Sequence, residues 1–253
     1  MLHHPTVSKL HTLRLAGMAT ALAEQASQPD IDQLGFEDRL GLLVDREMAL
    51  RDSRSLKLRL TRARLRQSAC LEDVDYRKPR GLDRTLMATL GTGAWLRQHL
   101  NILITGPSGV GKSWLMCALA NQACRLGFSA RYQRFDRLLQ EMTYARGDGR
   151  YAKLLAQTAK TDLLCLDDFL ISPLTDVARR DLLELLDDRY GLRSTIVTSQ
   201  LPIKHWHEAI GDPTLADAIL DRLVHNSHRI ELKGASMRKP DAAALTGDDT
   251  AHA

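Results

Sequence analysis

Apolar residues recur at helical spacing along the first fifty residues of the chain. One stripe predicts a helix over residues 6–26 and consists of Leu10, Leu13, Met18 and Leu22. After a break at Pro29 and Asp30, another stripe predicts a helix that begins near Phe36 and consists of Leu40, Leu43, Val44 and Met48. The amino-terminal part is therefore expected to be a small, all-helical domain.

Beyond residue 100 the pattern changes to short apolar runs that alternate with helical segments. The runs predict five strands, at residues 100–104, 128–132, 162–168, 195–199 and 229–232. The helical segments lie at residues 114–126, 135–144, 151–159, 177–190 and 213–223, with Asp176 and Asp212 as expected helix caps. Strands that alternate with helices predict an α/β fold with a five-stranded parallel sheet covered on both faces.

Three domains follow from these patterns. Residues 72–81 are acidic, then basic, and contain Pro79 and Gly81, so we interpret them as a linker. We expect a helical, basic domain at residues 1–75 and an α/β domain at residues 76–238. The tail at residues 239–253 has no periodicity and is expected to be disordered.

Residues 106–113 read Gly-Pro-Ser-Gly-Val-Gly-Lys-Ser and fit the phosphate-binding pattern Gly-x-x-x-x-Gly-Lys-[Ser/Thr]. A predicted strand precedes them and a predicted helix follows, which is the context that the pattern needs. Glycines let successive N–H groups line a concave anion site at a helix amino terminus. We therefore predict that ATP binds at Gly106, Pro107, Ser108, Gly109, Val110, Gly111, Lys112, Ser113 and Trp114.

Hydrolysis of a nucleotide needs further groups beside the phosphate loop. Asp167 and Asp168 end the third predicted strand, at the edge of the sheet where ligands bind in parallel α/β folds. Asp167 and the Ser113 hydroxyl are predicted to hold Mg²⁺, and Asp168 is predicted to face the γ-phosphate. Ser199 or Gln200, at the end of the fourth strand, is a candidate for holding the attacking water.

Positive charge gathers before the phosphate loop. The net charge is +4, with 16 Lys/Arg against 12 Asp/Glu in residues 1–100 and 19 against 19 in the remainder. Residues 51–66 alternate in hydropathy at 56–60, as a strand does, but their residue types favour a helix. This segment is either a solvated helix face or a phosphate-binding surface; only Asp52 opposes its seven cations, which favours DNA. The predicted DNA contacts are Arg51, Arg54, Lys57, Arg59, Arg62, Arg64 and Arg66, joined by Arg146 and Arg150 from a later loop.

The four cysteines and the hydropathy favour a protein of a reducing compartment. Cys70, Cys117, Cys124 and Cys165 lack metal-binding or redox spacing, and buried free thiols explain them better than disulfides. No apolar run approaches the length of a membrane span, and no signal-peptide core is present. We expect a cytoplasmic protein without a membrane partner.

Four stretches together resemble the IstB-like family of AAA+ ATPases, which accompany transposases and are related to DnaC-type helicase loaders. They are the phosphate loop, Leu-Cys-Leu-Asp-Asp-Phe at 164–169, Thr-Ser-Gln-Leu-Pro at 198–202 and Asp-Arg-Leu at 221–223. The resemblance covers nearly the whole chain. It implies an AAA+ core. Many AAA+ proteins carry a helical lid at the carboxy terminus, but only 21 residues follow Leu232 here, so the lid is expected to be missing or vestigial.

The resemblance also implies roles for single residues. Lys112 and Ser113 would be the phosphate-loop pair and Asp167 the Mg²⁺ carboxylate, while Asp168 stands where most AAA+ proteins have a longer Glu. Ser199 or Gln200 would be the first sensor. Arg222 would be an arginine finger that acts on a neighbouring subunit, and Arg238 would be a second sensor.

We weigh three functions. The leading hypothesis is a regulator of transposition, whose ATP-bound subunits assemble as a homo-oligomer on double-stranded DNA and recruit a transposase. The alternative is a helicase loader, in which the amino-terminal helices bind a replicative helicase and the DNA is single-stranded. A small-molecule P-loop kinase would need a substrate pocket and a lid domain, which the sequence does not reveal.

Overall fold

The structure, a computed structural model, describes residues 5–237. Internal contacts divide the chain into two compact units between Leu58 and Arg59. The division falls within the long helix α3 (Phe36–Ala63), which includes most of the basic segment and so confirms a helix there rather than a strand. The functional boundary expected at residue 75 stays a prediction.

The first unit contains three helices where the sequence predicts two. α1 (Pro5–Thr12) and α2 (Ala16–Gln25) precede a 3₁₀ turn, η1 (Ile31–Gln33), and the start of α3. The single helix predicted over residues 6–26 is therefore wrong. The chain breaks at Arg14, which has a left-handed φ of 60° that no helix interior accommodates.

A carboxylate from α3 explains why a new helix begins at Ala16. Glu47 is 6% exposed, and its Oε2 accepts the backbone N–H groups of Gly17 at 2.7 Å and Met18 at 3.3 Å. These N–H groups belong to the first turn of α2 and have no partner within the helix, so the carboxylate acts as a cap. Gly17 is required here, because an added Cβ would lie 2.7 Å from the Cα of Glu47.

The second unit is built on a five-stranded parallel sheet, which confirms the predicted α/β class. The strands are β1 (Asn101–Thr105), β2 (Ala130–Arg134), β3 (Leu163–Asp167), β4 (Ser194–Ser199) and β5 (Ser227–Glu231). Their order across the sheet is β2-β3-β4-β1-β5, and every pair is parallel. β1, β3 and β4 are buried throughout, which is why their central residues are apolar.

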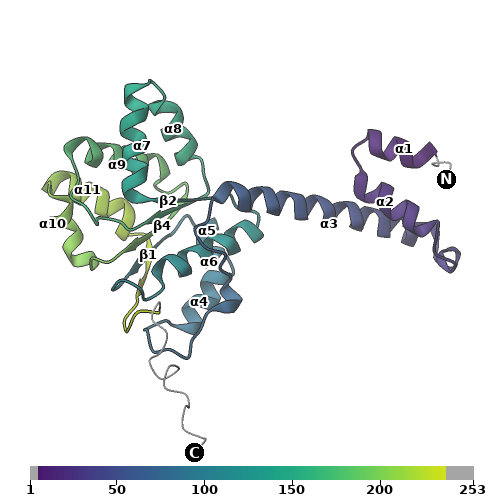
Figure 1. Ribbon diagram of the computed structural model, residues 1–253, viewed down its shortest axis with the longest axis horizontal. Coiled ribbons are helices and arrows are strands. Elements are labelled where there is room, and N and C mark those ends of the chain that lie inside the picture. The colour runs from purple at the N-terminus through teal and green to yellow at the C-terminus, as the bar shows by residue number, and fades with distance from the viewer. Residues whose placement is uncertain (1–4, 238–253) are drawn as a thin grey trace, which may run out of the picture. The chain divides into compact units, whose positions relative to one another are not determined.

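Helices cover both faces of this sheet (Figure 1). One face carries α6 (Lys112–Arg125), with α4 (Arg84–Gly91) and α5 (Ala94–Arg97) beside it. The other face carries α7 (Phe135–Gly147), α8 (Tyr151–Ala159), α9 (Asp176–Arg189) and α11 (Pro213–Val224). Shorter pieces are η2 (Leu71–Asp73), η3 (Ile203–His205) and α10 (Trp206–Ile210). Thr175, not Asp176, caps α9, because its hydroxyl accepts the N–H of Ala178.

An aromatic cluster fixes the end of β3. Phe169 is fully buried, with its ring centroid 4.6 Å from that of Phe135 and 5.0 Å from that of Trp206. Its backbone N–H also donates to the Thr198 carbonyl oxygen at 2.8 Å. The residues immediately before Phe169 are therefore held rigidly against β4, and these include both candidate carboxylates.

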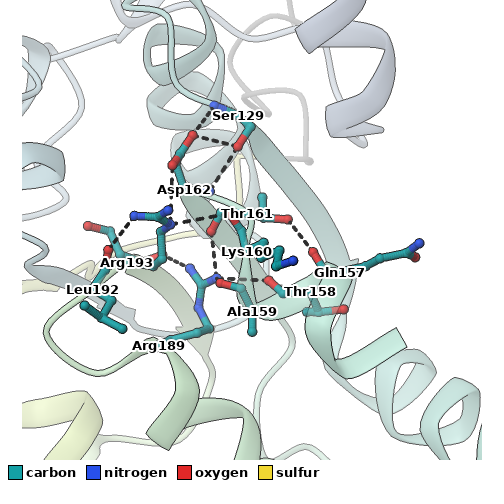
Figure 2. Close-up of polar contacts among 11 residues, drawn as sticks. Ser129, Gln157, Thr158, Ala159, Lys160, Thr161, Asp162, Arg189, Leu192 and Arg193 are labelled. Carbon is teal, nitrogen blue, oxygen red and sulfur yellow. Dashed lines mark hydrogen bonds and ion pairs between the residues drawn. The ribbon is translucent and has the colours of Figure 1, made fainter. Parts of the chain in front are cut away.

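A buried arginine connects the end of α8 and the segment before β3 to the start of β4 (Figure 2). Arg189 is 1% exposed, and its guanidinium donates to five acceptors: the carbonyl oxygens of Thr158, Ala159, Thr161 and Ser194, and Thr195 Oγ1. Burial lowers the pKa of Arg189, and the converging acceptors stabilise the charged form. The nearby Asp162 pairs with Arg193 at 3.5 Å and accepts the backbone N–H and the hydroxyl of Ser129.

Two further expectations concern the chain as a whole. All four cysteines are free thiols, as predicted. Cys117, Cys124 and Cys165 are buried, whereas Cys70 is only half-buried, so the expectation of burial was wrong for Cys70. Among the described residues, none of the helices combines the length and the apolar character that crossing a membrane would require.

Candidate nucleotide site

The predicted phosphate loop connects β1 to α6 in a conformation that depends on glycine. Gly106, Gly109 and Gly111 have φ values of 146°, 87° and 96°, which residues with a Cβ rarely adopt. Gly111 is also the N-cap of α6, and no side chain of the described residues caps that helix. The N–H groups of its first turn therefore remain available for an anion.

Lys112 lies inside the loop. It is 7% exposed, and its Nζ donates to the carbonyl oxygens of Gly106 and Pro107, both at 2.7 Å. The ammonium group is thus held directly beneath the concave face of the loop. From this position it can exchange a loop carbonyl for a phosphate oxygen without a change in the backbone.

A cavity of about 480 Å³ opens beside the loop. Its walls include Ser108, Ser113 and Trp114, as predicted, together with Asp168 and Gln200. Another wall consists of Gln67 and Ser68 together with three residues of the predicted linker, Asp73, Asp75 and Arg80. Arg80 fixes this wall to the loop, since its guanidinium donates to the carbonyl oxygens of Val110 at 3.3 Å and Asp75 at 3.1 Å.

The chain that follows β5 lies on the same loop. The backbone N–H of Met237 donates to the Gly109 carbonyl oxygen at 2.9 Å, and the backbone N–H of Lys233 donates to the Arg80 carbonyl oxygen at 2.9 Å. A Cβ on Gly106 would lie 2.1 Å from the Leu232 carbonyl oxygen. Residues 232–237 and the phosphate loop are therefore in direct backbone contact, which the sequence analysis did not anticipate.

Asp167 is the centre of the polar contacts at the end of β3. It is fully buried, and its Oδ1 accepts the Ser113 hydroxyl at 2.8 Å and the Thr198 hydroxyl. Its Oδ2 accepts the Tyr132 hydroxyl at 2.7 Å and lies 3.7 Å from Arg66 Nη1. Burial and the neighbouring carboxylate raise the pKa of Tyr132, so that the phenol keeps its proton and remains a donor. The structure thus brings Ser113 and Asp167 together, as the sequence predicted.

Asp168 follows in a left-handed conformation with a φ of 61°. Its backbone N–H donates to Thr198 Oγ1 at 3.2 Å, and its side chain faces the cavity, where Oδ2 lies 3.1 Å from Arg134 Nη2. A non-glycine residue in this region costs energy and persists where the surroundings hold it. Here the turn directs two successive carboxylates to the same site.

The two candidates for holding water lie in different surroundings. Ser199 is fully buried; its hydroxyl donates to the Phe169 carbonyl oxygen at 2.8 Å and accepts the N–H of Leu201 at 3.1 Å. Gln200 lines the cavity. Of the pair, Gln200 is therefore the residue placed to contact a nucleotide, whereas Ser199 stabilises the junction between β3 and β4.

Arg222 lies at the opposite end of β1 from the phosphate loop. It occupies the last turn of α11, and its carbonyl oxygen accepts Asn101 Nδ2 at 3.0 Å, at the start of β1. Its Nε contacts Asp187 Oδ1 at 2.8 Å, and it is not among the residues that line the nucleotide cavity. Arg238, the predicted second sensor, lies outside the described residues.

The predicted DNA contacts are distributed over both units. Arg51 pairs with Glu47 at 2.7 Å, Arg59 Nε donates to the Cys124 carbonyl oxygen at 2.8 Å, and Arg66 approaches Asp167. Arg146 was predicted to lie in a loop, but it belongs to α7, where it pairs with the buried Asp181. Arg150 pairs with Asp148 at 2.8 Å. Several of these cations therefore already have partners within the chain.

The site's donors fit ATP and Mg²⁺. A phosphate chain requires N–H groups and an ammonium, which the uncapped start of α6 and Lys112 provide. Mg²⁺ prefers one or two protein oxygens together with phosphate oxygens and water, and Ser113 and Asp167 would supply these. In the described part of the chain, no group of three or more His, Cys, Asp or Glu residues is arranged to hold a metal ion.

The parallel sheet and the phosphate loop between β1 and α6 define the class of α/β P-loop nucleotide-binding proteins. Solved structures with the same fold include DnaI, at a TM-score of 0.56 and 23% identity over 66% of this chain and 92% of that chain. Another is the replication initiator DnaA bound to AMPPCP and single-stranded DNA, at 0.55 and 20% over 68% of this chain and 52% of that chain.

Within this class, the chain belongs to the family of IstB-like ATP-binding proteins, whose model matches residues 8–244. An insertion sequence ATP-binding protein of Sinorhizobium fredii is 56% identical over 239 residues, which are 94% of this chain and 98% of that protein. The corresponding protein of insertion sequence IS21 from Pseudomonas aeruginosa is 32% identical over 96% of this chain and 92% of that protein.

Proposed function

We propose that this protein is a cytoplasmic, ATP-dependent regulator of DNA transposition. In its ATP-bound form it assembles as a homo-oligomer on double-stranded DNA and recruits the transposase of its insertion sequence. The observation that carries this proposal is the pairing of Ser113 with Asp167 beneath the phosphate loop, in a family named for insertion sequences. Such a site supports nucleotide-driven assembly rather than permanent binding.

The same residues support hydrolysis. Lys112 neutralises outer phosphate oxygens, and Ser113 with Asp167 holds Mg²⁺, which when bound stabilises the charge of the transferred phosphoryl group. Asp168 and Gln200, which face the cavity, orient the attacking water. Arg222 lies far from its own loop along β1, which supports a role on the nucleotide of a neighbouring subunit.

Contacts to DNA are assigned to phosphates rather than to bases. The basic residues 51–66, with Arg146 and Arg150, are arginine-rich, and arginine binds phosphate oxygens in a bidentate manner. Contacts of this kind position a protein on DNA without reading its sequence. The choice of target would consequently be loose.

A three-way co-precipitation tests the proposal. The purified full chain is mixed with duplex DNA and a non-hydrolysable ATP analogue, and then with either the transposase of the same insertion sequence or a replicative helicase. We expect capture of the transposase that depends on nucleotide and on DNA, and none with Lys112→Ala. Capture of the helicase instead, with a preference for single-stranded DNA, would identify a helicase loader. Phosphorylation of a small molecule without any DNA dependence would identify a kinase.

A further inference from the structure

Two buried arginines of the second unit differ in how fully their guanidinium groups are hydrogen-bonded. Every nitrogen of the Arg189 guanidinium donates to an acceptor. Arg80 is 7% exposed and lies in the wall of the nucleotide cavity, yet its Nε has no hydrogen-bond partner among the described residues. A buried donor without an acceptor lowers stability. Arg80 is therefore better explained by what it does at the cavity than by what it adds to stability.

The other two nitrogens of Arg80 join the predicted linker to the phosphate loop. Nη1 donates to the carbonyl oxygen of Val110 at 3.3 Å, and Nη2 donates to that of Asp75 at 3.1 Å. A Cβ added to Gly111 would lie 2.8 Å from Nη1, so the guanidinium packs directly against that glycine. The Val110 carbonyl thus has a charged donor that comes from outside the loop.

A second donor from outside the loop holds the preceding peptide. The backbone N–H of Met237 donates to the Gly109 carbonyl oxygen at 2.9 Å. The chain approaches closely here, because a Cβ added to Gly109 would clash with the side chain of Ser236. We call the Arg80 guanidinium and the Met237 N–H together the outer clamp.

The planarity of the peptide bond means that each carbonyl contact also orients an N–H group. In a trans peptide, the C=O of one residue and the N–H of the next point in opposite directions. A donor on the Gly109 carbonyl therefore directs the Val110 N–H away from Met237, and a donor on the Val110 carbonyl directs the Gly111 N–H away from Arg80. In the described part of the chain, neither of these N–H groups donates a hydrogen bond. Both are available for an anion, as in other phosphate loops.

We propose that Arg80 is a positioning residue of the ATP site, and that the outer clamp orients the Val110 and Gly111 N–H groups toward the phosphates of the nucleotide. Arg80 acts through the loop and not by contact with the nucleotide. Its positive charge also polarises the peptide between Val110 and Gly111, which makes the N–H a stronger donor. This inference rests on the proposed function, because it takes ATP as the ligand of the loop, and it extends the site to two segments outside the motif.

Nucleotide affinity tests the role of Arg80. Equilibrium binding of a fluorescent ADP analogue to the full chain, without DNA, is compared for wild type, Arg80→Met and Arg80→Lys. Methionine keeps the aliphatic bulk but has no donor, so affinity should fall about 10- to 100-fold, the usual worth of one hydrogen bond to a charged group. Lysine keeps a charged donor and should lose less. Wild-type affinity of Arg80→Met would overturn the proposal.

The matched control for Arg80 lies in the same linker. Arg77 is 91% exposed and pairs with the side chain of Asp75 at 3.2 Å, and it is not among the residues that line the cavity. Arg77→Met should therefore bind ADP as wild type does. An equal loss in Arg77→Met and Arg80→Met would show that any change in the linker weakens the site, and would overturn a specific role for Arg80.

A backbone substitution tests the other half of the outer clamp and does not depend on whether the Arg80 variants fold. Proline has no backbone N–H, so Met237→Pro removes the donor to Gly109, whereas Met237→Leu retains it. ADP affinity should fall for Met237→Pro and stay close to that of wild type for Met237→Leu. Equal affinities of these two variants would overturn the outer clamp.

The orientation of the loop is read from the amide signal of Gly111. The full chain is labelled with ¹⁵N-glycine, and the signal is assigned by its absence from Gly111→Ala. Saturating ADP should shift the Gly111 amide proton downfield in wild type, because the N–H then donates to a phosphate, and should shift it less in Arg80→Met. The signal of Gly41, in the first unit, should not differ between the two proteins. A full Gly111 shift in Arg80→Met together with weakened affinity would indicate direct contact of Arg80 with the nucleotide, and would overturn the positioning role.

The outcomes separate this inference from the proposed function. If the wild-type chain binds neither ATP nor ADP, both fail. If it binds nucleotide and captures the transposase while Arg80→Met and Met237→Pro bind ADP as wild type does, the inference alone fails.

Discussion

Asp168 is the residue on which hydrolysis depends most directly. Asp168→Asn removes the negative charge beside the cavity but leaves Lys112 and the Ser113–Asp167 pair intact. ATP binding should therefore persist while phosphate release falls by about 10²–10⁴-fold, the usual worth of a general base. Equilibrium binding and phosphate release measure the two quantities. The matched control is Asp188→Asn, which changes an exposed aspartate of α9. If Asp168→Asn released phosphate as fast as Asp188→Asn, the role of Asp168 in hydrolysis would be contradicted.

Lys112 should act at the binding step instead. Lys112 is 7% exposed and its Nζ donates to two carbonyl oxygens of the loop, so Lys112→Ala removes the outer-phosphate cation. We expect a loss of ATP affinity, measured by titration with a fluorescent ATP analogue. Retained affinity with lost turnover would move Lys112 from binding to catalysis.

Single residues of the site were predictable where a motif fixes them and not where tertiary packing does. The phosphate loop, Asp167 and Asp168 follow from spacing and from strand ends. Thr198, Tyr132 and Arg66 were missed as partners of Asp167, because the strand neighbours of β3 are unknown from the sequence. The sequence could not decide between Ser199 and Gln200 as the residue that contacts the nucleotide. The choice depends on which of the two the end of β4 directs toward the cavity.

At the scale of elements, α2 and α3 offer a matched pair of glycines. Gly17→Ala places a Cβ 2.7 Å from the Cα of Glu47, so it should destabilise the packing of α2 on α3 by on the order of 1–3 kcal/mol. Gly41→Ala, within α3, has no atom within 4 Å of its added Cβ and should stabilise the helix by about 0.5–1 kcal/mol. Hydrogen exchange of the α2 and α3 amides in the full chain measures both effects. Equal protection in the two variants would show that the close approach is not required.

Arg189 should stabilise the second unit far more than its neighbour Arg193. Arg189→Met leaves buried carbonyl oxygens without donors at the ends of α8 and β4, which should cost about 3 kcal/mol or more (Figure 2). Arg193→Met breaks a half-exposed contact to Asp162 and should cost less than about 1 kcal/mol. Urea unfolding of both variants gives the comparison, and similar midpoints would refute the role of the buried network.

Elements were predicted best where burial alone determines them. The apolar runs predicted β1, β3 and β4 because these strands are buried throughout. The edge strands β2 and β5 are only partly buried, and their sequences carry more polar residues. The helix over residues 6–26 failed, because Glu47, some thirty residues away in the chain, caps the new start at Ala16. The sheet order was not predicted, since an alternation of strands and helices is compatible with several orders.

For the whole molecule, the position of Arg222 predicts dependence on a neighbouring subunit. An arginine supplied in trans accelerates hydrolysis by about 10³–10⁵-fold, so specific activity should rise with protein concentration and with DNA. Arg222→Ala should bind ATP normally and lose this stimulation. Its pairing with Asp187 at 2.8 Å must break when it reaches another subunit.

Mixing two inactive variants provides the decisive comparison. Arg222→Ala retains an intact phosphate loop and Lys112→Ala retains an intact finger, so the mixture should recover partial ATPase activity. A mixture that co-assembles but is as inactive as its components would argue against a finger in trans.

The contact between residues 232–237 and the phosphate loop has a practical consequence for anyone who shortens or labels this protein. Sheet topology suggests that the domain is finished with β5, and a cut at Leu232 would spare the phosphate loop, both carboxylates and Arg222. Such a cut would nevertheless remove the backbone donor that Met237 gives to Gly109 and the one that Lys233 gives to Arg80. A bulky fluorescent label joined there would press on the same glycines. Truncations and fusions designed by motif alone would thus impair nucleotide binding while leaving the sheet intact, and their phenotype would imitate that of a mutated phosphate loop.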